Sequence, residues 1–568
     1  METTRQGEMA ERDGSEHDHG ADAGRRRSDV DSDTGSDTDT DAGSDTGTGG
    51  GIDRRRVLGV AAAVAGVAGL GATVAGCSDS GSGTGSGTDT GSAGAASAKA
   101  AGAGSGSGSG PGTAEQDLPG DSEWRITSYG PASAIEGYAD KVSVLPGEAV
   151  GLRVSTTAPS FRVSAYRMGW YNGAEARLVW QSGQVPGSVQ SAARFESSTR
   201  TVYTSWHDSL TVRTSNWPEG AYLLRLESSA GHRSFVPLVV RSASAAGKVL
   251  LMHAPATWQA YNLWGGYSLY QGPSGSYSSR SYEVSFDRPY DNGGGEKFLV
   301  YERAVVALAE RLRLPVAYTT GIDVHQDPAV LSGARAVISL GHDEYWTPQQ
   351  RASVTTARDA GTNVAFLGAN TCFRRIRFGS GLSSAGPDRT VICYKTAYTR
   401  DPLYGHDGAL VTTDYRTAPA ADPESSMTGV FYEGYPTDAP FVVHAADHWL
   451  YAGAGVKDGD SFAHLIGVEY DRVTPGQPTP RPLQIIGHSP LVCDGTSSHA
   501  DAAYYTVPSG AGVFASGTMR WVEGLMAATR DDRGDHGMDR RTAAFVNRTT
   551  ENLLRAFAAG PAGKTRPA

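Results

Sequence analysis

Short runs of alternating apolar and polar residues, separated by turns, fill the region from Trp124 to Arg241. Alternation with a period of two places every second side chain on the same face of a strand, and closely spaced turns leave no room for helices. We therefore predict an antiparallel β-sandwich over residues 123–243, stabilised by apolar packing. The candidates for its aromatic core are Trp124, Trp170, Trp180 and Trp217. The strand-like runs cover residues 141–144, 150–154, 161–166, 210–212, 222–226 and 236–240.

The pattern changes after Ala246, where continuous apolar runs alternate with segments of helical spacing. Continuous apolar strands are typical of a parallel sheet that is covered by helices on both faces. We predict such a doubly wound α/β domain over residues 244–568. The expected strands are 248–252, 336–340, 364–367, 483–487 and 512–514, and the expected helices are 296–312, 347–360 and 542–557.

The N-terminal part has no pattern of either kind. Residues 1–52 are acidic and almost devoid of large apolar side chains, so we predict a disordered leader. Residues 53–77 combine arginines, an apolar run and the ending Val-Ala-Gly-Cys, which predicts a twin-arginine lipoprotein signal with Cys77 as the lipidated residue. A single transmembrane anchor is the alternative. Residues 78–122, rich in Gly, Ser and Ala, would then tether an exported protein to the outer face of the cytoplasmic membrane.

Charge and cysteine content narrow the class of protein. The net charge of the 568-residue chain is −11, and residues 1–50 account for most of it, with 14 Asp and Glu against 5 Arg. The remainder is nearly neutral and has no basic stripe, which argues against nucleic-acid binding. Four cysteines without a CxxC pair exclude a disulfide scaffold and a structural zinc site of that type.

Three polar loops follow predicted strands of the α/β domain, where sheets of this kind place their functional residues. The first loop begins at His253 and contains Tyr261 and Asn262; the third contains Asn370. The second is Gly-His-Asp-Glu-Tyr-Trp, residues 341–346, and includes the candidate pocket residues Asp343 and Tyr345.

The second loop carries three consecutive ionisable residues directly after a buried strand. Burying them is costly unless they are paired or bind a ligand. One interpretation is that Asp343 or Glu344 caps the next helix. The other is a metal or acid–base site, because His342 and Glu344 point the same way in an extended turn, so that one ligates while the other transfers protons.

Several stretches carry a resemblance to a known family: IEGYADKVSVLPGEAV, YRMGWYNG, HAPATWQAYNLWGG, SYEVSFDRPY, ISLGHDEYWTP and AFLGANT. The sequence resembles the large (β) subunit of N,N-dimethylformamidase and its relatives from about residue 124 to the C-terminus. The resemblance implies hydrolysis of the C–N bond of a small amide or formamide. In fold terms we expect an immunoglobulin-like β-sandwich followed by a doubly wound domain of the glutamine-amidotransferase or flavodoxin type.

The resemblance also implies a mononuclear non-haem iron held by two tyrosinates and one glutamate, with a histidine two residues before the glutamate. These roles fall on Glu344 as ligand and His342 as the nearby histidine. Tyr261 is the first tyrosine; Tyr222 is the second by spacing, with Tyr267 as the fallback. Hard oxygen donors suit ferric iron, and three protein ligands leave a position for water.

Other interpretations remain open. Cys372 follows a buried strand and is a candidate nucleophile, or else a structural cysteine that pairs with Cys393 after export; Cys493 is expected to be a small buried residue. Arg520 would recognise a substrate carboxylate or form a structural ion pair. The chain would act with a small amide substrate, and as a homo-oligomer or with a small partner subunit. The alternative function is a non-catalytic surface lipoprotein that binds a ligand in the same pocket.

Overall fold

The structure is a computed structural model that describes residues 114–383, 386–527 and 536–568. Two sheets that share one apolar core form the first part of the described chain. The leader, signal and tether predictions, including Cys77, lie outside the described residues. No helix in the described ranges is long and apolar enough to cross a membrane. The three-stranded sheet has the order β1 (Ile135–Ala139), β3 (Ala149–Thr156) and β9 (Leu210–Arg213). The six-stranded sheet contains β2 (Ser143–Val144), β11 (Arg233–Val240), β10 (Gly220–Ser228), β4 (Ser160–Met168), β5 (Ala176–Gln181) and β6 (Val185–Pro186).

The inward side chains of both sheets fill the shared core. Leu152 of β3, Val163 of β4 and Leu224 of β10 are fully buried in it. Of the tryptophan candidates, Trp217 lies in this core and Trp180 packs against it. Trp124 is also fully buried, but it belongs to a different cluster that includes helices of the α/β part.

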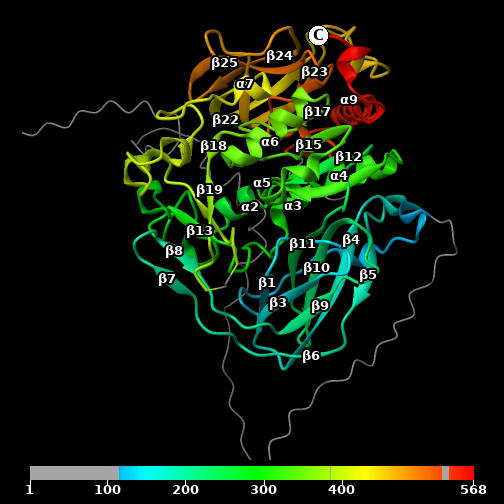
Figure 1. The fold of residues 1–568 in the computed structure, drawn as a ribbon. Coiled ribbons are helices and arrows are strands. Elements are labelled where there is room, and N and C mark those ends of the chain that lie inside the picture. The colour runs from blue at the N-terminus through cyan, green and yellow to red at the C-terminus, as the bar shows by residue number, and fades with distance from the viewer. Residues whose placement is uncertain (1–113, 384–385, 528–535) are drawn as a thin grey trace, which may run out of the picture. The chain divides into compact units, whose positions relative to one another are not determined.

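A seven-stranded sheet forms the centre of the second part (Figure 1). Five strands pair in parallel, and two antiparallel strands extend one edge. In sequence, the parallel strands have the order 2-1-3-4-5. The strands across the sheet are β14 (Val316–Thr320), β12 (Val249–His253), β15 (Ala336–Ser339), β17 (Asn363–Phe366), β26 (Gly512–Ala515), β25 (Thr496–Thr506) and β24 (Leu483–Cys493).

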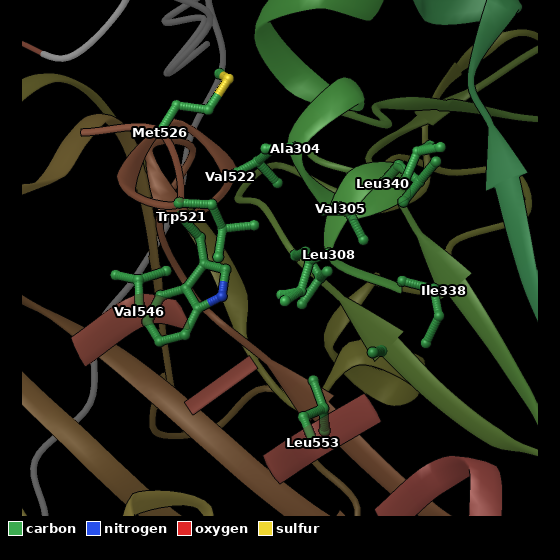
Figure 2. Close-up of a cluster of buried hydrophobic side chains, with 14 of the residues drawn as sticks. Ala304, Val305, Leu308, Ile338, Leu340, Trp521, Val522, Met526, Val546 and Leu553 are labelled. Atoms are coloured by element: carbon green, nitrogen blue, oxygen red, sulfur yellow. The ribbon is translucent and has the colours of Figure 1, made fainter. Parts of the chain in front are cut away.

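Helices cover both faces of this sheet because its strands are apolar on both faces. Leu251 and Ile338 point into the cluster formed with α4 (Arg303–Arg311), α8 (Trp521–Gly524) and α9 (Arg540–Ala559). Figure 2 shows this cluster, with Leu308 of α4 between the sheet and Trp521. The neighbouring residues Leu250 and Val337 point the opposite way, toward α5 (Gly321–Gln326) and α6 (Pro348–Asp359). This alternation places a core on each side of the sheet.

The helix predicted over residues 296–312 is in fact two helices, α3 (Glu296–Tyr301) and α4. The chain leaves helical geometry at Glu302, whose φ is −131°. The buried carboxylate of Glu302 accepts hydrogen bonds from the indole of Trp258 at 2.9 Å and the backbone N–H of Ala254 at 3.2 Å, and lies 2.5 Å from Nδ1 of His253. A buried carboxylate needs these partners, and reaching them interrupts the helix.

Smaller elements surround the large sheets. They are α2 (Pro255–Tyr261), α7 (Ser425–Thr428), β7 (Arg194–Glu196), β8 (Thr201–Tyr203), β13 (Glu283–Ser285), β16 (Tyr345–Trp346), β18 (Arg374–Arg375), β19 (Arg377–Gly379), β20 (Thr390–Ile392), β21 (Thr413–Asp414), β22 (Phe431–Val442) and β23 (Ser461–Arg472). The 3₁₀ helices are Glu115–Asp117, Ser122–Trp124, Tyr171–Gly173, Trp264–Gly266, Tyr277–Ser279, Pro328–Leu331, Lys395–Arg400, Gly408–Leu410, Trp449–Tyr451 and Ala562–Lys564. Strands β22 and β23 pair as a two-stranded ribbon.

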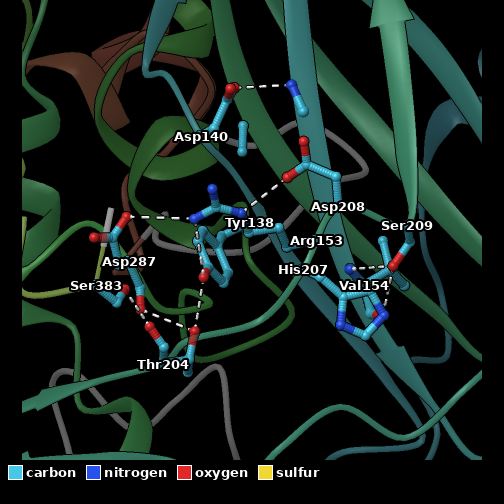
Figure 3. A network of polar contacts seen from close by, with 12 residues as sticks. Tyr138, Asp140, Arg153, Val154, Thr204, His207, Asp208, Ser209, Asp287 and Ser383 are labelled. Atoms are coloured by element: carbon cyan, nitrogen blue, oxygen red, sulfur yellow. Dashed lines mark hydrogen bonds and ion pairs between the residues drawn. The ribbon is translucent and has the colours of Figure 1, made fainter. Parts of the chain in front are cut away.

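A polar network joins the first sheet to segments that come later in the chain (Figure 3). Arg153 of β3 donates to Asp208 at 3.0 Å and lies 3.8 Å from the fully buried carboxylate of Asp287. The hydroxyl groups of Tyr138 and Thr204 are 2.7 Å apart. The hydrogen bonds that Arg153 donates to Tyr138 and Asp208 hold its pKa above the ordinary value against the effect of burial. The network therefore ties strands β1 and β3 to the segment that follows β13.

Candidate functional site

Four side chains from two loops meet near the carboxyl ends of strands β12 and β15. Tyr261 is the last residue of α2, Tyr270 follows in the irregular segment after it, and His342 and Glu344 follow β15. The hydroxyl of Tyr261 donates to Oε2 of Glu344 at 2.6 Å, and the hydroxyl of Tyr270 approaches the same oxygen at 2.6 Å. The two phenol oxygens are 2.8 Å apart. We call Tyr261, Tyr270, Glu344 and His342 the oxygen cluster, since three of its members supply oxygen atoms.

His342 completes the cluster from the side of Tyr261. Its Nε2 lies 2.9 Å from the Tyr261 hydroxyl and 3.5 Å from Oε2 of Glu344. Burial opposes the protonated form of His342, but the hydrogen bond to Glu344 and the negative charges of Glu344 and Glu469 together raise the pKa of the imidazole. Burial likewise opposes the ionised form of Glu344, and the interaction with His342 lowers the pKa of this carboxyl. Side chains two residues apart therefore face the same way, as the extended turn predicts.

Glycines allow the Gly-His-Asp-Glu turn to pack closely against α3 and the loop after β17. Gly341 has a φ of +48°, and a Cβ there would lie 2.3 Å from the carbonyl oxygen of Tyr301. A Cβ on Gly368, in the loop after β17, would lie 2.1 Å from the carbonyl oxygen of Gly341. Contacts this short do not occur, so both positions need glycine. The Gly-His-Asp-Glu turn is thus fixed from both sides.

Two further contacts hold Glu344 in place. The hydroxyl of Thr257 in α2 accepts the backbone N–H of Glu344 at 3.1 Å. Nε of the buried Arg374 lies 3.3 Å from Oε1 of Glu344. Glu344 is only 1% exposed, and the Arg374 cation compensates the charge of its buried carboxylate while Thr257 fixes its backbone.

A buried lysine lies against the other side of the cluster. Nζ of Lys395 is 3.2 Å from the centre of the Tyr270 ring and has no hydrogen-bond partner among the residues that the structure describes. Burial holds the pKa of Lys395 well below its ordinary value. Tyr345 donates its hydroxyl proton to the Tyr270 oxygen at 2.8 Å. Tyr270 is therefore contacted by the Lys395 amine over its ring and by a hydrogen bond at its oxygen.

A small, mainly apolar pocket opens beside the cluster. It is narrow, since the centre of a water molecule could occupy only about 10 Å³ of it. His342 and Tyr261 form its polar end. Its lining also includes Thr257, Trp258, Lys297, Tyr301 and Met519.

The structure does not bring Tyr222 to this site. Tyr222 lies in β10, where its hydroxyl donates to the carbonyl oxygen of Pro218 at 2.7 Å and its ring stacks on Trp217 in the core of the first two sheets. The fallback, Tyr267, packs its ring at a tilt against Phe195 instead. Both tyrosines were predicted from their spacing along the chain. Spacing does not tell where an irregular loop brings its side chains in space.

The other predicted pocket residues have different positions. Tyr345 contacts the cluster through Tyr270. The Asn262 side chain holds its own loop together, donating to Pro289 at 2.9 Å and accepting from Trp264 at 3.0 Å. Asp343 turns back toward β15 and accepts from Ser339 at 2.9 Å; burial raises its pKa to about 7. The backbone N–H of Asn370 donates to Asp471 at 2.8 Å.

Neither Asp343 nor Glu344 caps the helix that follows them. The cap of α6 is Thr347, whose hydroxyl accepts the backbone N–H of Gln350 at 3.1 Å. Arg520 pairs with Asp438 at 3.2 Å, as the structural alternative predicts.

The described cysteines are free thiols, so the predicted pairing of Cys372 with Cys393 is wrong for this structure. Cys372 is fully buried in an apolar cluster, and burial raises its pKa to about 12. A thiol that stays protonated is a poor nucleophile, which argues against a catalytic role for Cys372. Cys493 is partly buried at the end of β24.

Sequence reasoning missed three residues of the site: Tyr270, Arg374 and Lys395. The only signal for Tyr270 is its position in the Tyr-rich loop, three residues after Tyr267. Arg374 and Lys395 lie in later segments, and nothing near them in the sequence indicates a site.

Together these features define a mixed α/β protein with a buried, oxygen-rich site at the carboxyl ends of parallel strands. The chain belongs to a known family: the model described as "N,N-dimethylformamidase beta subunit-like, C-terminal" matches residues 162–536, more than half of the chain. No curated protein matches the chain. Among solved structures, a cycloisomaltooligosaccharide glucanotransferase from Paenibacillus sp. complexed with cycloisomaltoheptaose is 14% identical over 24% of this chain and 18% of that chain, with a TM-score of 0.13.

Proposed function

We propose that this protein is a metal-dependent amidohydrolase that cleaves the C–N bond of a small amide or formamide. The observation that carries the proposal is the triangle of oxygens from Tyr261, Tyr270 and Glu344, whose edges measure 2.6 to 2.8 Å. Membership of the N,N-dimethylformamidase β-subunit-like family supports the same reaction class.

The three oxygens fit a ferric ion as one face of its coordination shell. Oxygens bound at about 2.0 Å and at right angles to one another lie about 2.8 Å apart. Phenolate and carboxylate are hard anionic donors, which suit ferric iron better than zinc. The three oxygens would leave open positions, and iron held there would supply a Lewis acid that polarises an amide carbonyl and acidifies water.

The side chains around the triangle would do the rest. Nε2 of His342 would accept the proton of the attacking water and return it to the leaving amine. Arg374 would keep the Glu344 carboxylate oriented, and Lys395, in its protonated form, would offset negative charge on Tyr270. The apolar walls of Trp258, Tyr301 and Met519 suit small, uncharged N-alkyl groups.

The fold type, a partner subunit and export from the cytoplasm are part of the same proposal. The two sheets of the first part would form an immunoglobulin-like sandwich, and the strand order 2-1-3-4-5 is that of the flavodoxin-like doubly wound fold. The family description names a β subunit, which favours a small partner subunit. Residues 53–77 favour export as a lipoprotein.

Iron content and amide turnover in the same preparations test the proposal. The full chain and its Glu344→Gln variant would be produced in iron-replete medium, with Tyr222→Phe as a tyrosine control outside the cluster. We expect near-stoichiometric iron, a visible tyrosinate-to-iron absorption band and amine release from N,N-dimethylformamide or related amides, all lost in Glu344→Gln and retained in Tyr222→Phe. Iron-free native protein, or iron unaffected by Glu344→Gln, would overturn the metal assignment.

A further inference from the structure

A second group of side chains of the types that ligate metals lies on the hairpin of β24 and β25, at the edge of the seven-stranded sheet (Figure 1). His488 of β24 is paired directly with Asp501 of β25. His499 precedes Asp501 by two residues on the same strand, so its side chain points to the same face of the sheet. The group shares no residue with the oxygen cluster.

The three side chains are already close to one another. Nδ1 of His488 lies 2.7 Å from Oδ1 of Asp501, and Nε2 of His499 lies 3.5 Å from Oδ2. One ligand atom from each of the three residues falls within 4.8 Å of the others. Ligands bound to zinc at about 2.0–2.1 Å in a tetrahedral site are roughly 3.3 Å apart, so small rotations of exposed imidazoles would suffice.

We propose that His488, His499 and Asp501 bind a divalent transition-metal ion such as Zn²⁺. Two imidazole nitrogens and one carboxylate suit zinc and its neighbours, whereas Mg²⁺ and Ca²⁺ prefer oxygen ligands alone. His488 and His499 are 41% and 30% exposed, so an ion can reach them from solvent and keep bound water.

Asp501 is preorganised for this role. Its side chain is fully buried beneath the two imidazoles, and Oδ2 accepts the backbone N–H of Val473 at 2.9 Å. A hydrogen bond to a metal-ligating side chain orients that ligand and strengthens metal binding. The exposed ring of His444 lies 5.8 Å from that of His488 and offers a further imidazole nearby.

The competing explanation is an ordinary hydrogen bond between a histidine and an aspartate. The chain contains a matched example, since Nδ1 of His464 lies 2.9 Å from Oδ1 of Asp438. Unlike His488 and Asp501, this pair does not belong to a group of three possible metal ligands among the described residues. His464→Ala is therefore the control for loss of a histidine–aspartate contact.

The test is calorimetric titration of the full chain with Zn²⁺, with Mg²⁺ as the comparison ion and Co²⁺ absorption as a spectroscopic readout. Because the oxygen cluster also offers ligands, each titration is repeated in the Glu344→Gln background. We expect a binding step that survives Glu344→Gln and His464→Ala and weakens on the order of tenfold or more in His488→Ala and in His499→Ala. Mg²⁺ should give no such step.

Partly exposed histidines at a sheet edge tolerate alanine, so melting curves in chelator should match for these variants. The proposal would be overturned by Zn²⁺ binding that is absent, that disappears with Glu344→Gln, or that is equal in the native chain and both His488→Ala and His499→Ala. These outcomes are separate from the fate of the amidohydrolase proposal, which rests on iron at Glu344.

Discussion

Each oxygen of the Glu344 carboxylate has several partners, and this crowding defines the chemistry of the site. Two phenols, an imidazole and a guanidinium lie within 3.5 Å of a side chain that is almost fully buried. Phenols release their protons readily only when a strong positive charge replaces them. At the residue scale, the proposed metal would therefore bind as the two phenol protons leave.

Tyr270 is the first residue to test on this argument. Tyr270→Phe removes one of the three oxygens, so we expect iron content and the visible absorption band to fall together. Tyr267→Phe is the matched control, because Tyr267 lies three residues earlier in the same loop and packs against Phe195 outside the cluster. Equal iron in Tyr270→Phe and native protein would remove Tyr270 from the ligand set.

A substitution of His342 should separate iron binding from proton transfer. His342→Gln leaves all three oxygens in place, so we expect iron to be retained while kcat for amide hydrolysis falls about 10²–10³-fold, the usual contribution of a general acid–base group. Elemental analysis and steady-state kinetics on the same sample measure both. If iron and activity disappear together, His342 is a ligand and the assignment of the three oxygens is incomplete.

At the scale of elements, the sequence predicts regular structure better than it predicts the site. The strands at 248–252, 336–340 and 364–367 were predictable because apolar residues there are buried on both faces of the sheet. The break at Glu302 was not, because it depends on His253 and Trp258 more than forty residues earlier. Strand β24 continues past the predicted end at residue 487 to Cys493, because β25 pairs with it along its whole length.

The same limit applies to the site. His342 and Glu344 come just after an apolar strand, and Tyr261 ends the short helix that follows another, so a rule about strand ends finds them. Tyr270 lies in an irregular segment between residues 262 and 282, where no periodicity indicates direction. Its place is decided by contacts with Glu344 and Tyr345, both more than seventy residues later.

The start of α6 offers a prediction at this scale. Thr347 caps the helix directly after the Gly-His-Asp-Glu turn, and its hydroxyl also lies 2.9 Å from Nδ1 of His325. Thr347→Ala should lower the free energy of unfolding by about 1 kcal/mol, the usual cost of a lost N-cap. Thr347→Ser keeps the hydroxyl and should retain most of the stability in thermal melts. Equal losses in both variants would assign the effect to the methyl group instead.

At the scale of the whole molecule, a buried ion pair connects the two large sheet systems. Arg167 of β4 donates to Glu310 of α4 at 2.6 Å, and both side chains are 4% exposed. Tyr318 of β14 also donates to Glu310, at 2.7 Å, and Arg167 donates to Tyr171 at 2.8 Å. Charge and hydrogen bonds from both parts therefore converge on one carboxylate.

Removing one partner of this pair should destabilise both parts of the structure together. Arg167→Met leaves the Glu310 carboxylate buried without its cation, which costs about 3–5 kcal/mol in comparable pairs. Arg167→Met/Glu310→Gln removes the charge as well and should recover part of that loss. Arg555→Met is the control, because Arg555 pairs with Glu551 at an exposed site where ion pairs contribute little. We expect a single cooperative melting transition that shifts downward in Arg167→Met and is partly restored in the double variant, which would identify this pair as a coupling point. Two separate transitions in the native chain would show instead that the two sheet systems unfold independently.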